Sequence, residues 1–263
     1  MTTPLSTRPP ARRIDLRGLV LPLALLALWW ALTHYGWVNT KLIVPPGNVL
    51  AVATQTLSDP LFWQGALFSL GRDVSGFALG ALSGVALGCL LGVSRWADRL
   101  IGPSFHTLRQ ISLFAWLPLL STWFGYGELS KLIFIGLSTL YPVVLGTVEG
   151  VRGVSLAHAE VARVFRFSRT QLLFRLILPA AAPQIATGLT LGLVYAWVAT
   201  IGSEFLLANW GNGLGNIIIK GRAAFNIELI IVGMLAIGIV GTALNRFAAW
   251  LELRLLPWQR RAG

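Results

Sequence analysis

The charged residues that could recognise another molecule are concentrated between Val151 and Pro183. This segment has a single acid, Glu160, and its five arginines are Arg152, Arg163, Arg166, Arg169 and Arg175. A structured basic segment of this kind at a membrane surface suggests a docking element. We predict that the segment binds a soluble protein, with anionic lipid as the alternative partner of each single arginine.

Near-helical periodicity also runs through this segment. Leu156–Leu178 contains no Gly or Pro, and its apolar residues recur at helical spacing except around Phe167 and Ser168. We therefore predict two short helices joined at Phe167–Ser168. The Ser168 hydroxyl would cap the second helix, and Pro179 would end it because proline lacks an N–H and clashes with the preceding turn.

A second candidate, Glu204, lies in the apolar run Ile185–Leu207. A carboxylate at membrane depth is costly and usually has a function. The alternative is an ion pair with Lys220, Arg222 or Arg72. We favour the ion pair slightly, so that Glu204 would serve as a gate or a structural contact.

The sequence contains no set of residues that indicates catalysis or metal binding. His34, His106 and His158 lack metal-ligand spacing, and the single cysteine, Cys89, excludes an intramolecular disulfide and a multi-cysteine metal site. The chain has no G-x-x-x-x-G-K-[ST] motif that would bind ATP phosphates. We expect no catalytic residue, no metal and no cofactor.

Composition places these residues in a membrane protein. Of 263 residues, 55% are hydrophobic and 12% are charged, and the mean hydropathy is +0.70. A soluble domain carries about twice that share of charge. The net charge of +11 comes from bases beside apolar runs, which favours the positive-inside pattern over nucleic-acid binding.

Six apolar runs are long enough to position the candidate residues across a membrane. We predict an all-α polytopic membrane protein whose six transmembrane helices lie at about residues 18–38, 74–93, 105–124, 129–148, 185–207 and 227–250, with a kink at Pro118. The membrane domain would cover residues 18–250 between tails at 1–17 and 251–263. Segment 151–183 would join the fourth and fifth spans.

The second span has a glycine at every fourth position: Gly76, Gly80, Gly84, Gly88 and Gly92. Small residues at this spacing let a second helix approach closely in lipid. We interpret this face as a packing surface rather than a substrate site.

Orientation follows from the distribution of Lys and Arg. With a cytoplasmic N-terminus, sixteen of these residues fall on the cytoplasmic side and five on the other, namely Lys41, Arg72, Lys131, Lys220 and Arg222. The positive-inside rule therefore predicts that both termini and segment 151–183 are cytoplasmic.

Several short motifs follow one another in a familiar order. They are Pro45-Pro46, Ser69-Leu70-Gly71-Arg72, Leu117-Pro118-Leu119, Trp123-Phe124-Gly125 with Glu128, Glu160-Val161-Ala162, Leu178-Pro179-Ala180-Ala181, Ala196-Trp197 with Glu204, and Gly211-Asn212-Gly213-Leu214-Gly215. On these residues the chain resembles, over about Ile43–Trp250, the membrane subunits (permeases) of binding-protein-dependent ABC importers. The resemblance is closest to their aliphatic sulfonate, taurine and nitrate branch.

The resemblance implies a type I ABC importer permease fold in a bacterial inner membrane. Segment 151–183 would form coupling helices that insert into a groove of a separate ATPase, which hydrolyses the ATP. The implied coupling residues are Glu160, Ala162, Arg163, Arg166, Ser168, Arg169, Leu178 and Pro179. The implied partners are an ATP-binding subunit dimer, a second permease copy and a periplasmic or lipid-anchored solute-binding protein. The implied substrate is a sulfonate, taurine or nitrate, with an aromatic acid or vitamin precursor as the alternative.

Two positions depart from the family pattern. Arg166 replaces the glycine between the coupling helices, where glycine would allow a positive φ. Ser112 replaces the proline of an arginine-x-x-proline pattern that begins at Arg109. The expected pathway candidates, each with packing as its alternative, are Ser112, Trp116, Thr139, Tyr141, Tyr195, Thr200 and Glu204.

Two other classes of membrane protein fit less well. A secondary transporter needs an ion or proton site at mid-membrane, and the spans offer no acidic pair there. An intramembrane enzyme needs a nucleophile and a base that converge, and no such set is apparent.

Overall fold

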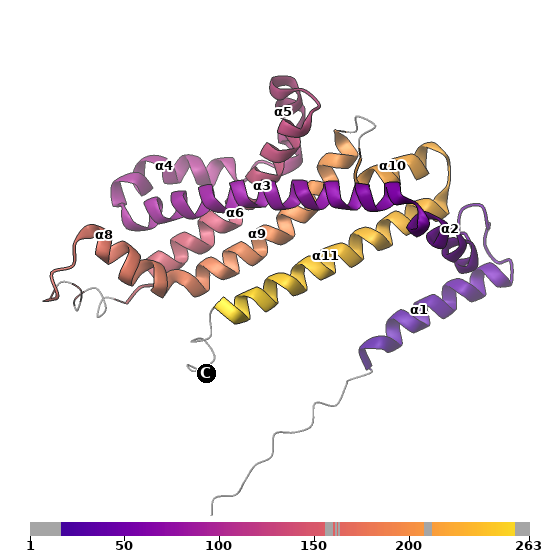
Figure 1. Cartoon of the computed structure of the whole chain (residues 1–263), viewed down its shortest axis with the longest axis horizontal. Helices are drawn as coiled ribbons and strands as arrows, with labels where there is room; N and C mark the ends of the chain where they lie inside the picture. The colour runs from indigo at the N-terminus through magenta and orange to yellow at the C-terminus, as the bar shows by residue number, and fades with distance from the viewer. Residues whose placement is uncertain (1–16, 156–159, 161, 163, 208–211, 256–263) are drawn as a thin grey trace, which may run out of the picture.

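A computed structural model of the chain describes residues 17–155, 160, 162, 164–207 and 212–255. Within these residues every regular element is a helix (Figure 1). The helices are α1 (Arg17–His34), α2 (Pro46–Ser58), α3 (Pro60–Val93), α4 (Arg95–Leu108), η1 (Leu113–Trp116), α5 (Leu117–Phe124), α6 (Glu128–Arg152), α8 (Arg169–Gln171), η2 (Leu172–Ile177), α9 (Leu178–Leu206), α10 (Leu214–Ala223) and α11 (Ile227–Leu255).

Four of the described helices are long and apolar enough to cross a membrane. They are Pro60–Val93, Glu128–Arg152, Leu172–Leu206 and Ile227–Arg254. Two shorter apolar helical stretches, Val20–His34 and Leu113–Phe124, complete a set of six. The structure is therefore an all-helical, multi-pass membrane fold with the predicted number of apolar segments.

The expected third span, residues 105–124, is not one helix. α4 ends at Leu108, residues 109–112 are non-helical, and the helix resumes as η1 and α5. Pro118 lies in the first turn of α5, where backbone N–H groups have no partner within the helix, so its missing N–H costs no hydrogen bond. The interruption therefore lies before Pro118 and not at the predicted kink. Hydropathy missed the break because it measures how apolar the residues are and not whether their backbone hydrogen bonds continue.

A second correction concerns Pro179, which does not end the coupling helix. α8, the π-helical η2 and α9 follow one another without a gap from Arg169 to Leu206. In η2 the N–H of Leu178 bonds to the carbonyl of Leu173, one residue further back than in an α-helix. This wider turn lies directly before Pro179 and gives its ring the room that a regular turn would deny.

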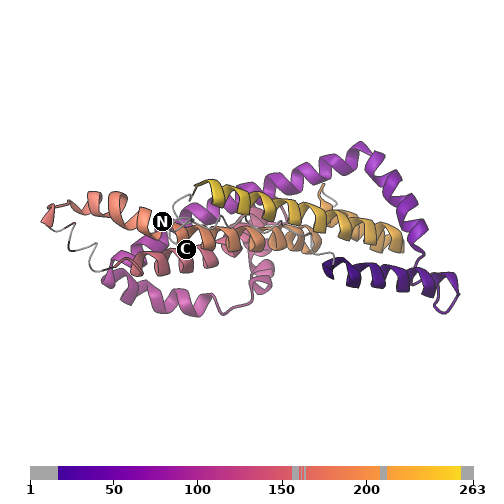
Figure 2. The ribbon, with the colours of Figure 1, turned by 90° about the horizontal axis from the view of Figure 1, so that it is seen from below.

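The core is a layer of three long helices in which α6 lies between α3 and α9 (Figures 1 and 2). The α3 glycines Gly76, Gly80, Gly84, Gly88 and Gly92 face, in that order, Ile135, Thr139, Val143, Thr147 and Val151 of α6. A Cβ at any of these glycines would lie 2.5–2.9 Å from the facing side chain. The two helices therefore pack at a distance that only glycine permits along this face.

α6 and α9 also pack closely at positions occupied by glycine. A Cβ on Gly146 would lie 2.8 Å from the Cα of Gly188, and one on Gly192 would lie 2.9 Å from Val143. α11 packs on α9, where Trp197 donates from Nε1 to the carbonyl of Ile237 at 3.3 Å. Close helix packing thus fixes the positions of all candidate residues on α6 and α9.

Candidate functional site

The candidate residues lie at three levels along α6 and α9. Glu128 begins α6 and Glu204 stands near the end of α9, and these two positions meet at one end of the bundle. Arg152 ends α6 and Leu178 begins α9, at the opposite end, where α8 also lies (Figure 1). A polar network occupies the first end, and segment 151–183, called the basic hairpin from here on, occupies the other. A cavity lies between them.

The first helix of the basic hairpin ends in a Schellman motif. The N–H of Phe167 bonds to the carbonyl of Ala162 at 3.0 Å, and Arg166, directly before Phe167, has a φ of +50°. This is the left-handed position that glycine usually occupies after a helix. Arg166 therefore adopts the backbone conformation of the glycine that it replaces, rather than changing the turn.

The second helix of the hairpin begins with a capping box, as the prediction for Ser168 requires. The N–H of Gln171 donates to the Ser168 hydroxyl at 3.2 Å, and the N–H of Ser168 donates to Oε1 of Gln171 at 2.9 Å. These reciprocal bonds satisfy donors that a helix start leaves unpaired. Two adjacent caps thus fix both sides of the hairpin turn.

The hairpin presents apolar and charged side chains together. Val164 is 80% exposed and Phe165 is 71% exposed, whereas Ala162 is buried and Glu160 is exposed. Arg169 is the first residue of α8, and Arg163 lies outside the described residues. Exposed aromatic and aliphatic residues on a capped turn suit insertion into a protein groove.

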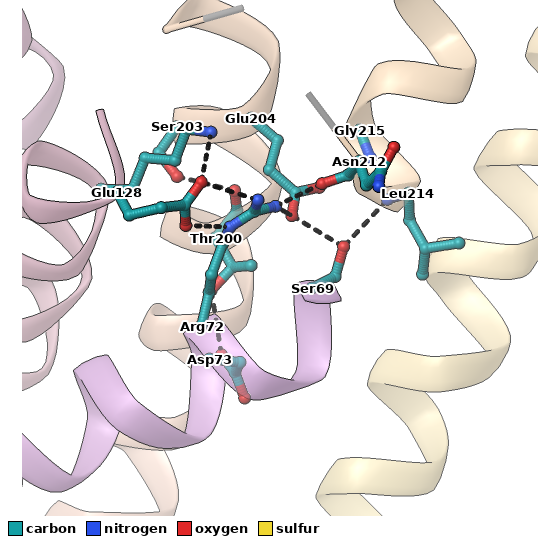
Figure 3. A network of polar contacts seen from close by, with 11 residues as sticks. Ser69, Arg72, Asp73, Glu128, Thr200, Ser203, Glu204, Asn212, Leu214 and Gly215 are labelled. Atoms are coloured by element: carbon teal, nitrogen blue, oxygen red, sulfur yellow. Dashed lines mark hydrogen bonds and ion pairs between the residues drawn. The ribbon is translucent and has the colours of Figure 1, made fainter. Parts of the chain in front are cut away.

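The opposite end of the bundle holds a buried ion network around Arg72. Its Nη1 lies 2.7 Å from Oε1 of Glu204, and its Nε lies 2.5 Å from Oε2 of Glu128. Figure 3 shows the guanidinium between the two carboxylates. Glu204 is fully buried and Arg72 is 7% exposed, so α3 and α9 are joined by an ion pair that water does not reach, whereas Glu128 of α6 is partly exposed.

The first turn of α10 closes this network. Ser69 donates to Glu204 at 2.7 Å and accepts from the N–H of Leu214 at 2.9 Å, while the N–H of Gly215 donates to Glu204 at 2.9 Å. A Cβ on Gly213 would lie 2.5 Å from the Glu204 carboxyl carbon. The glycines at 213 and 215 are therefore required by the close approach of backbone to carboxylate. Of the three partners that the sequence allowed for Glu204, Arg72 is the one observed.

Asp73, next to Arg72, was not singled out by sequence reasoning. Its side chain is fully buried, accepts from the Thr200 hydroxyl at 3.2 Å, and has one oxygen with no hydrogen-bond partner among the described residues. The available signal was an acid within the long apolar helix α3. Asp73 and Thr200 tie α3 to α9 one turn from the ion network.

A cavity of about 360 Å³ lies between the break after α4 and the middle of α6 and α9. Its lining residues are Arg109, Gln110, Ile111, Leu113, Ser138, Tyr141, Pro142, Leu145 and Tyr195. Two predicted pathway residues, Tyr141 and Tyr195, are therefore brought together here. The exposed Ser112 belongs to the same break, and Trp116 lies at the end of η1 with a buried Nε1 that has no partner in the described part.

The remaining pathway candidates occupy helix contacts. Thr139, Thr200 and Glu204 are all 0% exposed. The Thr139 hydroxyl donates to the carbonyl of Ile135 at 3.0 Å, and its side chain faces α3. These three residues therefore line no open space in this conformation.

The sequence and the fold are both similar to those of known proteins. Residues 80–261 match the family model described as the binding-protein-dependent transport system inner membrane component. The chain belongs to this family of permeases. A protein named as an aliphatic sulfonates transport permease, SsuC of Bacillus subtilis, is 34% identical over 93% of this chain and 88% of its own. The bicarbonate permease protein CmpB of Synechococcus elongatus is 32% identical over 93% and 92%, and the taurine permease protein TauC of Escherichia coli is 30% identical over 89% and 86%.

Solved structures share the fold of this permease. An inward-facing MetNI methionine ABC transporter aligns with a TM-score of 0.63 at 18% identity, covering 74% of this chain and 97% of the other. An amino acid ABC transporter aligns with the same TM-score at 17% identity, covering 78% and 98%. The predicted family and all-helical importer fold are thus confirmed.

Proposed function

We propose that this permease carries a small oxyanion across the bacterial inner membrane and that a separate ATPase drives it through the hairpin around Arg166. The observation that carries the proposal is the capped, exposed hairpin at the start of one unbroken helical path, α8–η2–α9. Because the turn is capped and the helical path after it is unbroken, a displacement of the hairpin would move α9 with it.

The path leads from the hairpin to the ion network. α9 begins at Leu178 beside the hairpin and reaches Glu204, which binds Arg72 of α3. Packed helices respond to a displacement by shifting as bodies rather than by continuous deformation. Closure of the ATPase around bound ATP would therefore move α9 against α3 and α6, and this movement would open the pathway between them.

The substrate class is inferred from chemistry that the relatives have in common. Their names refer to aliphatic sulfonates, bicarbonate, taurine and nitrate. All of these carry a compact anionic group of oxygens around sulfur, carbon or nitrogen. We assign such an oxyanion to this permease, delivered by a solute-binding protein outside and accepted by two permease copies in the membrane.

Orientation follows from the same assignment. The hairpin faces the cytoplasm, where ATP is available, and both termini lie on that side. The Arg72 network then lies at the outer end of the bundle. This placement agrees with the predominance of Lys and Arg on the hairpin side.

Glu160→Lys tests the coupling role, because it reverses the single acidic charge of the hairpin at an exposed position. The variant should reach the membrane in normal amounts, and ATP-dependent uptake by the assembled transporter should fall at least about tenfold, the effect of losing roughly 1.4 kcal/mol of coupling. ATP hydrolysis should persist although uptake falls. Glu228→Lys, which reverses an acidic charge at the start of α11, is the control outside the hairpin and should transport normally. Normal transport by Glu160→Lys would refute the assignment.

A further inference from the structure

Arg109 stands at the middle level of the bundle. It lines the cavity of about 360 Å³ together with Tyr141, which lies near the middle of α6, and Tyr195 of α9. Sequence reasoning counted Arg109 with the cytoplasmic bases, because it opens an expected span. The structure instead places Arg109 in the wall of a cavity whose other lining residues include Tyr141, far from both ends of α6.

The three cations on α3 and α6 all have carboxylate partners. Arg72 binds Glu128 and Glu204, and Lys131 lies 3.3 Å from Glu128. Arg152 lies 2.7 Å from Asp98. Within the part of the chain that the structure describes, no carboxylate lies within ion-pair distance of Arg109. An unpaired cation at membrane depth is costly and marks the route of an ion or polar substrate.

The backbone around Arg109 supports a hydrated, ligand-accepting site. α4 ends at Leu108 and η1 starts at Leu113, so the regular helix is interrupted for four residues. The N–H of Arg109 makes the last helical bond, to the carbonyl of Phe105, and the N–H groups of Gln110 and Ile111 make turn bonds to residues three positions back. Non-helical backbone at membrane depth persists only where protein covers it or where it lines a polar cavity. Helices interrupted at mid-membrane commonly surround the substrate site of a transporter.

The side chains in this cavity suit an oxyanion. Arg109 offers a planar set of N–H donors, Gln110 an amide donor, and Tyr141 and Tyr195 hydroxyl donors. Proteins usually bind planar or tetrahedral oxyanion groups with an arginine guanidinium and additional neutral hydrogen-bond donors. The volume lies within the range of about 300–1,000 Å³ that is typical of small-molecule sites.

We propose that Arg109, assisted by Gln110, Tyr141 and Tyr195, forms an anion-binding station midway along the pathway, where the oxyanion exchanges water for these donors. The proposal rests on the proposed oxyanion-transport function. It assigns charge selectivity to this permease itself, in addition to any selection by a binding protein.

Charge-selective thiol labelling of the full-length permease in membrane vesicles tests the station without ATP. Cys89→Ala removes the native thiol, and Leu145→Cys places a reporter in the cavity wall outside the proposed donors. The probes are the anionic reagent methanethiosulfonate ethylsulfonate and its cationic trimethylammonium counterpart. Arg109→Gln should lower the ratio of anionic to cationic labelling rates by about tenfold, because the charge attracts one reagent and repels the other.

Two comparisons make the outcome decisive. Arg109→Lys should keep most of the ratio, and Arg99→Gln, which changes an exposed arginine of α4 outside the cavity, should leave it unchanged. Methanesulfonate or nitrate should slow labelling in the Arg109 protein and not in Arg109→Gln. An unchanged ratio in a monodisperse Arg109→Gln protein would overturn the station while leaving ATP-driven transport intact, whereas failure of the Glu160→Lys test would refute the coupling role and not the station.

Discussion

The two carboxylates that bind Arg72 differ in one property that decides their contribution to stability. Glu204 is fully buried, whereas the side chain of Glu128 is 58% exposed. Both lie within 2.7 Å of the guanidinium, so distance alone would make them equal. We predict that Glu204→Gln destabilises the protein far more than Glu128→Gln.

The magnitudes follow from burial and from the bonds that each variant loses. Glu204 accepts from Arg72, Ser69 and the N–H of Gly215, and a glutamine at this position must turn an NH2 group toward one of these donors. Removing one partner of a buried pair costs about 3–5 kcal/mol. We expect about 3 kcal/mol, the lower end of that range, because Arg72 keeps its bonds to Glu128. For the exposed Glu128 we expect about 1 kcal/mol or less.

The assay is thermal unfolding of the purified permease in one detergent, followed by tryptophan fluorescence. With about 2–4 °C of melting temperature per kcal/mol for a chain of this size, Glu204→Gln should fall by roughly 6–12 °C and Glu128→Gln by about 4 °C at most. Glu228→Gln, which lies outside the network, should melt like the parent protein. Equal shifts for the two carboxylates would refute the argument that burial controls the strength of this network.

Three further predictions concern helix packing and the hairpin turn. Gly80→Ala should lower the melting temperature, because its Cβ would lie 2.6 Å from Thr139 and overpacking costs about 1–3 kcal/mol. Gly71→Ala, whose Cβ would have no atom within 4 Å, should leave the melting temperature unchanged. Equal shifts would contradict the close packing of α3 on α6. Arg166→Gly should keep ATP-dependent uptake and Arg166→Val should reduce it, because glycine adopts a positive φ freely whereas a β-branched residue tolerates it worst. Equal uptake would show that the turn conformation is unimportant. Ser168→Ala should speed amide hydrogen exchange in the first turn of α8, because a lost cap costs about 1 kcal/mol, and unchanged exchange would rule out the capping role.

Local patterns in the sequence were sufficient for much of this structure. The Ser168 cap depends on neighbours three residues away, and both partners are visible in the sequence. The number of apolar segments follows from hydropathy in the same way. These features were predictable because each depends on a short stretch of chain.

Other features depend on contacts or geometries that no local pattern contains. Arg72 and Glu204 are 132 positions apart, so the sequence offered three candidate partners and could not choose among them. The Pro179 prediction was wrong because the rule for proline assumes a regular α-helix, and the π-turn before it is not visible in composition. The cavity beside Arg109 was missed because the apolar run concealed the break at 109–112.

The central claim is that ATP hydrolysis by a partner subunit drives an oxyanion through this permease. The most direct measurement is uptake of labelled taurine, nitrate or methanesulfonate into vesicles that contain the assembled transporter and its binding protein, with ATP supplied on the hairpin side and all ion gradients dissipated. We predict accumulation that requires ATP and that Glu160→Lys lowers at least about tenfold. Uptake that proceeds without ATP and follows an imposed proton or sodium gradient would contradict the claim.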